Sequence, residues 1–168
     1  LEPTFYVRDY GTGMSHEDCM QLYTTYFRST RNDSNDAVGC LGLGSKAPFA
    51  YADQFNVESY QDGVVRIYTA YQSKDGTPMF SLMDTQDTEE PNGLKVTMAV
   101  KEDDLYDFKD EAVSLYQYFD IKPNMIGEEL SYTDEDVQIQ GKGWRIVGAK
   151  YNTVPKVIMG QIAYPFTL

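Results

Sequence analysis

Two glycine-rich stretches of the chain contain residue types that could bind a phosphorylated ligand. The first, RDYGTGM at residues 8–14, places a carboxylate before two glycines and a methionine: Asp9, Gly11, Gly13 and Met14. The second, GCLGLGSKAPF at residues 39–49, places three glycines before a hydroxyl and a lysine: Gly39, Gly42, Gly44, Ser45 and Lys46. Glycine lets the backbone approach a ligand closely, and lysine is a common phosphate partner. Both stretches are therefore candidates for a nucleotide-binding site.

The residue order in the second stretch excludes three phosphate-binding loops. A P-loop requires lysine followed by serine or threonine, whereas Ser45 precedes Lys46 here. A Rossmann turn requires the spacing G-x-G-x-x-G, and residues 39–44 have the reverse spacing. A protein-kinase glycine loop requires a downstream H-R-D sequence, but the single histidine of the chain is His16.

The first stretch suits the base of a nucleotide. Asp9, at the end of a predicted strand, can accept a hydrogen bond from the exocyclic amine of adenine. Gly11 and Gly13 remove side chains where the base would approach, and Met14 offers a soft apolar wall for a flat ring. The alternative is an ordinary strand-to-helix turn in which Asp9 is only a turn former.

The second stretch suits phosphates. Its glycines would let the backbone fold around the phosphates, and the next helix would direct its free N–H groups at them. Ser45 adds a hydroxyl and Lys46 adds a positive charge, although Lys46 could also be a solvated surface residue. The loop between the stretches offers further candidate phosphate or ribose contacts, or is simply solvated: Ser29, Thr30, Arg31 and Asn35.

Hydrophobic periodicity and turn residues predict an α+β fold. The predicted strands are residues 3–8, 54–60, 64–72, 79–85 and 94–100, with further strands in 137–168. The predicted helices are residues 16–27, a short helix that opens after Gly44, and residues 104–119, while residues 28–38 are predicted as a loop. The four strands between residues 54 and 100 are expected to form an antiparallel meander.

Composition and charge limit the possible partners. The chain has 168 residues, of which 42% are hydrophobic, and a formal net charge of −12. This charge argues against a nucleic-acid-binding face and against a polybasic membrane patch. No apolar run approaches the ~20 residues of a membrane-spanning helix, so we expect no direct membrane insertion.

The cysteines and the histidine do not indicate a metal or nucleophilic centre. Cys19 and Cys40 are isolated, and the chain has no C-x-x-C pair, so a four-ligand zinc site is not expected. His16 lies within a helix-capping signal, S-x-x-D, formed by Ser15 to Asp18. These residues therefore predict neither a zinc site nor a nucleophilic centre that depends on His16.

Taken together, the two stretches resemble the GHKL ATPase superfamily, which comprises gyrase, the heat-shock-90 chaperones, histidine kinases and MutL. The shared pattern is D-x-G-x-G-M before a helix, a polar loop of lid size, and G-x-x-G-x-G at the opening of another helix. Residues 5–53 also resemble the N-terminal domain of the rIIA proteins of T-even-like phages. The shared segments there are Y-F-x-S-[ST], S-N-D and G-L-G-S-K-x-P-F-x-Y.

This resemblance implies a fold, a cofactor and a domain division. The fold would be a Bergerat-type two-layer sandwich, with helices on one face of a mixed, mostly antiparallel sheet, lacking its N-terminal helices. Residues 1–120 would be a partial ATP-binding domain, and residues 121–168 the strand-rich start of a following subdomain. ATP or ADP would bind with Mg²⁺. Many members have Gly-Thr at the start of a core strand, where this chain has Gly93-Leu94, which leaves Thr97 as a nearby threonine that could face the pocket.

The resemblance also bears on catalysis. The family's glutamate general base and magnesium-binding asparagine lie upstream of D-x-G-x-G, and only eight residues precede Asp9. We therefore expect a fragment of an ATP-binding domain that, by itself, binds nucleotide weakly or not at all and does not hydrolyse ATP. The alternative is a degenerate, non-catalytic GHKL scaffold for dimerisation or partner binding. A histidine-kinase domain fits the strands after residue 120 poorly.

The rIIA resemblance implies a biological setting as well. Those proteins are linked to lysis inhibition and to exclusion by resident prophages. The resemblance thus implies action in the host cell cytoplasm, with peripheral association at the inner membrane. The implied partners are a second copy of the chain or a phage or host protein.

Overall fold

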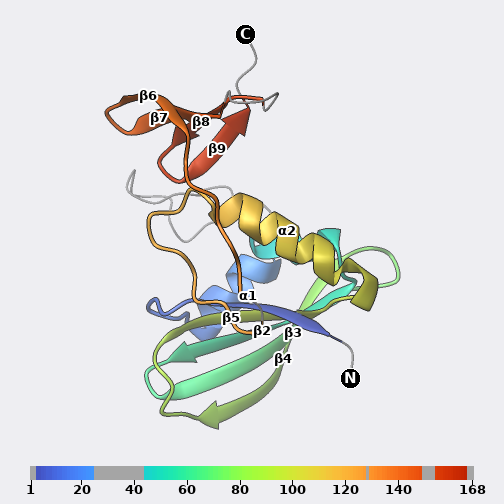
Figure 1. Ribbon diagram of the computed structural model, residues 1–168. Coiled ribbons are helices and arrows are strands. Elements are labelled where there is room, and N and C mark those ends of the chain that lie inside the picture. Colours follow the sequence, from blue (N-terminus) through green and yellow to red (C-terminus); the bar gives the residue numbers. More distant parts are fainter. Residues whose placement is uncertain (1–2, 25–43, 128, 149–153, 166–168) are drawn as a thin grey trace. The chain divides into compact units, whose positions relative to one another are not determined.

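The chain divides into two compact units, Leu1–Glu102 and Asp103–Leu168. The computed structural model describes residues 3–24, 44–127, 129–148 and 154–165 (Figure 1). The predicted domain boundary after residue 120 falls inside the second unit and stays a prediction. The D-x-G-x-G stretch and the described part of the second glycine stretch both belong to the first unit.

The first unit is built on a five-stranded sheet with the strand order β1-β5-β2-β3-β4. Its strands are β1 (Thr4–Arg8), β2 (Gln54–Gln61), β3 (Val64–Gln72), β4 (Pro78–Asp87) and β5 (Gly93–Ala99). The predicted positions of these strands are confirmed. The predicted α+β class is confirmed, and every pairing between the described strands of this sheet is antiparallel.

The predicted four-stranded meander was wrong at its last strand. β2, β3 and β4 pair in sequence order, but β5 pairs with β2 and β1 rather than with β4. Alternation along a strand shows which residues share a face, but it does not show which strand is the neighbour. The crossover places β5 beside β1, and therefore beside Asp9.

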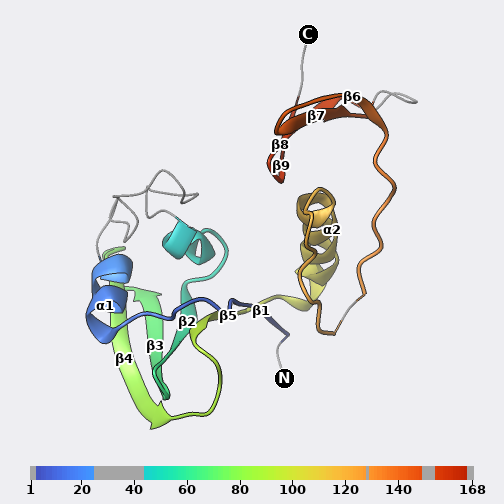
Figure 2. The ribbon, with the colours of Figure 1, turned by 90° about the vertical axis from the view of Figure 1, so that its left-hand side faces the viewer.

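Two helical segments cover one face of this sheet (Figure 2). The predicted helix at residue 16 is confirmed as α1 (His16–Thr24). Its predicted cap is present, because Ser15 Oγ accepts a hydrogen bond from the Asp18 N–H at 3.1 Å. The predicted helix after Gly44 is a 3₁₀ helix, η1 (Gly44–Ala50), rather than an α-helix. Pro48 within it has no N–H to donate to the preceding turn.

The core lies between these helical segments and the sheet. Inward-facing residues of the strands meet α1 in one buried cluster: Cys19, Tyr23, Phe55, Val57, Tyr68, Ala70 and Phe80. Tyr23 of α1 stacks on Phe80 of β4 at 4.6 Å between ring centroids, and Phe49 of η1 meets Phe55 of β2 edge-on at 4.8 Å. These contacts fix both helical segments over β2, β3 and β4.

The second unit contains a helix and a four-stranded antiparallel sheet. Its elements are the turn η2 (Glu102–Asp104), which begins in the first unit, then α2 (Leu105–Tyr116), β6 (Val137–Gly141), β7 (Trp144–Val147), β8 (Lys156–Met159) and β9 (Ile162–Pro165). Lys122 donates to carbonyl groups at the end of α2, and Arg145 holds both carboxylate oxygens of Glu135. None of the helices described is long and apolar enough to cross a membrane.

The core predicts the reactivity of the Cys19 thiol. The side chain is fully buried, and burial raises the pKa of the thiol. In a Cys40→Ser variant, we expect a thiol reagent at pH 8 to label Cys19 at least about 100-fold more slowly without urea than in urea, because labelling requires an opening of the core. Equal rates in the two conditions would contradict this packing.

Candidate functional site

Asp9 lies one residue beyond β1 and is held by the start of β5. Its N–H donates to the Leu94 carbonyl at 2.9 Å, which extends the pairing of the two strands. Its Oδ1 accepts hydrogen bonds from the N–H groups of Gly11 at 2.8 Å and Leu94 at 3.3 Å. No described residue bonds Oδ2, and the residue is exposed. Asp9 thus forms the turn through one oxygen and offers the other as an acceptor.

The side chain of Asp9 faces the helix-bearing side of the sheet. Residues opposite each other in antiparallel strands share a face, and the register places Asp9 beside Leu94, which lies opposite Ser59 of β2. Leu94 packs against the buried core beneath α1. Val7, two residues before Asp9 on the same face, is 50% exposed. Among the described residues, this face of the sheet is therefore covered near β3 and β4 and open near β1.

The loop after Asp9 is fixed closely against β2. Gly13 has φ +71°, and a Cβ added there would lie 2.0 Å from the Tyr60 carbonyl oxygen, so a larger residue cannot take this position. Met14 follows; its N–H donates to Ser59 Oγ at 3.0 Å, and its carbonyl accepts from the same hydroxyl at 2.7 Å. The four predicted base-side residues therefore belong to one ordered loop, with Met14 packed against the core.

Behind Asp9, an arginine ties β1 to the turn that precedes β5. Arg8 donates to the carbonyls of Pro91 at 2.6 Å and Asp9 at 2.9 Å. Its guanidinium lies over the rings of Tyr60 and Tyr10, at 3.9 and 5.0 Å from their centroids. These contacts fix the backbone that carries the Asp9 carboxylate.

The phosphate-side residues are placed at the opposite end of α1. Lys46 is only 9% exposed, and its Nζ donates to the Leu22 carbonyl at 2.6 Å and to Ser45 Oγ at 3.2 Å. Burial lowers the pKa of the Lys46 ammonium. Lys46 is thus a buried residue that donates a hydrogen bond to the backbone of α1. The position of Lys46 in the motif does not indicate this contact. Gly44 opens η1, while Gly39, Gly42 and the loop candidates 29–31 and 35 lie outside the described residues.

Thr97 does not face this site. Leu94, Val96 and Met98 of β5 all pack toward the helix-side core, so Thr97 points to the other face of the sheet. Leu94 therefore places an apolar side chain next to Asp9 on the helix-bearing face. Leu94 thus contributes its backbone N–H to the site, whereas a threonine at this position would also have contributed a hydroxyl.

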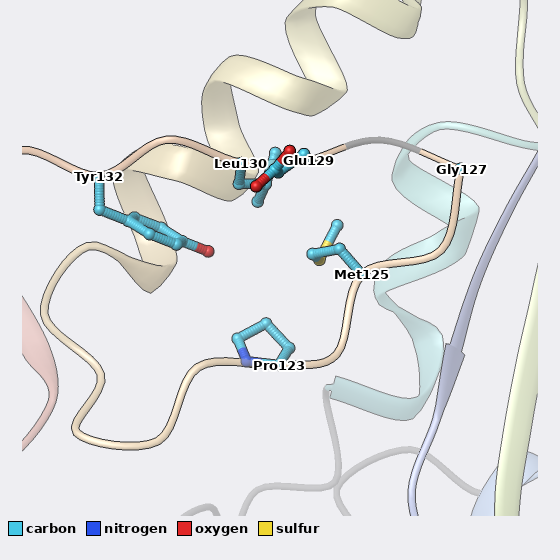
Figure 3. A pocket seen from close by; sticks show the side chains of 6 residues that line it. All are labelled: Pro123, Met125, Gly127, Glu129, Leu130 and Tyr132. Atoms are coloured by element: carbon cyan, nitrogen blue, oxygen red, sulfur yellow. The ribbon is translucent and has the colours of Figure 1, made fainter.

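Neither of two surface hollows contains a predicted site residue. One, of about 540 Å³, lies at the far ends of β1 and β5 and is lined by residues including Pro3, Tyr51 and Lys101. The other, of about 470 Å³, belongs to the second unit, and the Tyr132 hydroxyl points into it (Figure 3). Among the described residues there is no group of three side chains that could hold a metal ion.

Sequence reasoning missed two residues that hold the site together, Ser59 and Arg8. Ser59 alone had a detectable signal, because it is a polar residue at an inward-facing position of an alternating strand, after Phe55 and Val57. The partners of Arg8 come from the distant residues Pro91 and Tyr60, which no local pattern connects to it.

Comparisons with known proteins agree with this architecture. No protein-family model matches the chain. The ATPase and transducer domains of DNA topoisomerase II from Balamuthia mandrillaris superpose with a TM-score of 0.57, over 95% of this chain and 51% of that one, at 15% identity. The chain has a GHKL-type ATPase fold. The similarity to the topoisomerase spans both units of the chain, and at this identity it establishes the fold and no more.

Two further proteins are similar to parts of this chain. The chaperone protein HtpG of Mycolicibacterium vanbaalenii is 27% identical over 125 residues, which are 64% of this chain and 19% of the chaperone. The ATPase region of Saccharomyces cerevisiae topoisomerase II covers 69% of this chain with a TM-score of 0.47, and the chain spans 35% of that structure. The chain thus corresponds to about half or less of each similar protein.

The Gly13 geometry predicts a specific loss of stability. Gly13 and Gly76 have similar backbone angles, φ +71° and +81°, but a Cβ at Gly76 meets no atom within 4 Å. Gly76→Ala should reduce the free energy of unfolding by about 1 kcal/mol through backbone strain alone. Gly13→Ala adds the clash with Tyr60 and should cost about 3 kcal/mol or more, measured by urea unfolding. Equal losses would show that the loop does not lie against β2 as described.

Proposed function

We propose that this chain binds ATP, with adenine against Asp9 and the phosphates toward Ser45 and Lys46 of the second glycine stretch. The observation that carries the proposal is the Asp9 carboxylate, which has one oxygen held by two backbone N–H groups and the other available on the open part of the sheet face. The GHKL-type fold of the chain supports the proposal. ATP binding by this chain rests on these observations together.

The arrangement of the carboxylate favours adenine over guanine. The Watson–Crick edge of guanine presents two adjacent N–H donors, which match a carboxylate with both oxygens free. Asp9 Oδ1 already accepts two hydrogen bonds, from Gly11 and Leu94, so only Oδ2 remains. A single acceptor suits the exocyclic amine of adenine. Met14, in the same loop, supplies an apolar surface for the ring.

The phosphates are proposed to lie near Ser45 and Lys46. The cap residue Ser15 and the Lys46 partner Leu22 are separated by about 10 Å along α1, a span that a ribose can bridge between base and phosphates. In a chain of net charge −12, a local cation is needed to attract a triphosphate. The described residues do not form a magnesium site of their own, so the proposal concerns binding and assigns no general base.

Calorimetric titration with ATP, with and without Mg²⁺, tests the proposal. In Asp9→Asn, the amide can keep its oxygen toward Gly11, which would place its NH₂ group against the adenine amine. Donor would then meet donor, and we expect the Kd for ATP to rise at least about 10-fold. Asp110→Asn, an exposed aspartate of α2 in the second unit, is the matched control and should bind as the wild type does.

Two results would count against the proposal. Unchanged affinity in Asp9→Asn would refute the adenine assignment while leaving nucleotide binding in place. Absence of ATP binding by the wild-type chain at millimolar concentration would refute the function itself. That result would favour the degenerate scaffold, in which the fold serves dimerisation or partner binding.

We also propose a biological role of the rIIA type, in which the protein acts in lysis inhibition or prophage exclusion. The support is the set of segments within residues 5–53 that resemble the rIIA proteins. The same proposal includes the domain order, in which a partial ATP-binding domain, residues 1–120, precedes a strand-rich subdomain, residues 121–168. Expression of the reading frame that encodes this chain should restore delayed lysis to a phage that lacks its own rIIA protein. If the protein is expressed and lysis still occurs as early as in the phage without any rIIA protein, this role is overturned.

A further inference from the structure

We infer that Ser59 is a positioning residue for adenine recognition, which acts by holding the Met14 peptide at a fixed place relative to the Asp9 carboxylate. The inference rests on the proposed function, since it concerns the same site. Ser59 does not belong to either glycine stretch, and it would not touch the nucleotide. Its effect would pass through the loop that it anchors.

The Ser59 hydroxyl forms two hydrogen bonds with the backbone of one residue, Met14. It is fully buried, donates to the Met14 carbonyl at 2.7 Å and accepts from the Met14 N–H at 3.0 Å. A hydroxyl has one donor and two acceptor sites, so the two bonds to Met14 use its donor and one of its acceptor sites. Both polar groups of Met14 thus depend on one side chain of the sheet.

The location of Ser59 gives these bonds a functional meaning. Asp9, Leu94 and Ser59 occupy one row across β1, β5 and β2, on the helix-bearing face. The loop starts at Asp9, which Leu94 holds at one end of this row, and reaches Met14, which Ser59 holds at the other end. Ser59 therefore sets the separation between the amine acceptor and the apolar wall, which must match the width of one base.

Neighbouring contacts do not replace this anchor. Gly13 lies against the Tyr60 carbonyl, but this is a van der Waals contact and it gives Met14 no hydrogen-bond partner. Without the Ser59 hydroxyl, the Met14 N–H and carbonyl would lose the partners they have in the part of the chain described, beside a buried core. Such groups turn toward water, which moves the loop.

The test compares Ser59→Ala with Ser59→Thr and a control, Ser81→Ala, in the whole chain. Ser81 is a half-buried serine of β4, away from the loop. The probes are adenosine, ATP and inorganic triphosphate. We expect Ser59→Ala to raise the Kd for adenosine and for ATP by the same factor, about 10-fold, while leaving that for triphosphate unchanged. Ser59→Thr, which keeps the hydroxyl, should recover most of this loss, and Ser81→Ala should show none.

A double variant separates positioning from stability. If Ser59 acts through the Asp9 carboxylate, Ser59→Ala should weaken adenosine binding much less in an Asp9→Asn background than in the wild type. The inference would be overturned if the increases in Kd for adenosine caused by the two substitutions multiplied in full in the double variant. It would also be overturned if Ser59→Ala bound adenosine with wild-type affinity. If the wild-type chain binds neither adenosine nor ATP, the proposed function and this inference both fail, which is distinct from failure of the inference alone.

Hydrogen exchange keeps the inference testable if Ser59→Ala does not fold. In the wild-type chain, the Met14 amide should be protected by its bond to Ser59, whereas the Tyr10 amide, in the exposed part of the loop, should exchange freely. Adenosine should increase the protection of Met14 further. Exchange of Met14 as fast as that of Tyr10, with or without adenosine, would overturn the inference.

Discussion

The pairing of β1 with β5 is the constraint on which the candidate site depends. It brings residue 9 beside residue 94, which are far apart in the sequence, and it lets one backbone N–H of β5 fix the orientation of a carboxylate. It also makes β5 the link between β1 and the rest of the sheet. Without β5, the base-side loop would have no fixed relation to the core under α1.

The same pairing explains several residue choices around it. Gly93, at φ +139°, has no room for a Cβ, because one would lie 2.1 Å from the Asp9 carbonyl oxygen. Arg8 stabilises this close approach by donating hydrogen bonds to the carbonyls of Asp9 and Pro91. Its guanidinium in turn lies over the rings of Tyr10 and Tyr60. A close backbone contact, a stacked cation and a short loop therefore act together to present one carboxylate oxygen.

The sequence could predict the parts of this structure that depend on local chemistry. The S-x-x-D cap, the turn formed by Asp9 and the alternation of the five strands are all properties of neighbouring residues, and all are present. The insertion of β5 between β1 and β2 is a non-local choice that alternation does not encode. For the same reason, the motif identified Lys46 but not its hydrogen bond to the Leu22 carbonyl. The role of Ser59 likewise depends on the contact between Met14 and β2, which no local pattern encodes.

The burial of Lys46 has a thermodynamic consequence for any anion that would bind there. Its ammonium group holds the carbonyl of Leu22, close to the C-terminus of α1, where a positive charge stabilises the helix. A phosphate that recruits this ammonium competes with the helix terminus for the same proton donors. The two equilibria are then linked, so that whatever loosens the end of α1 strengthens anion binding, and bound anion loosens the helix end to the same extent.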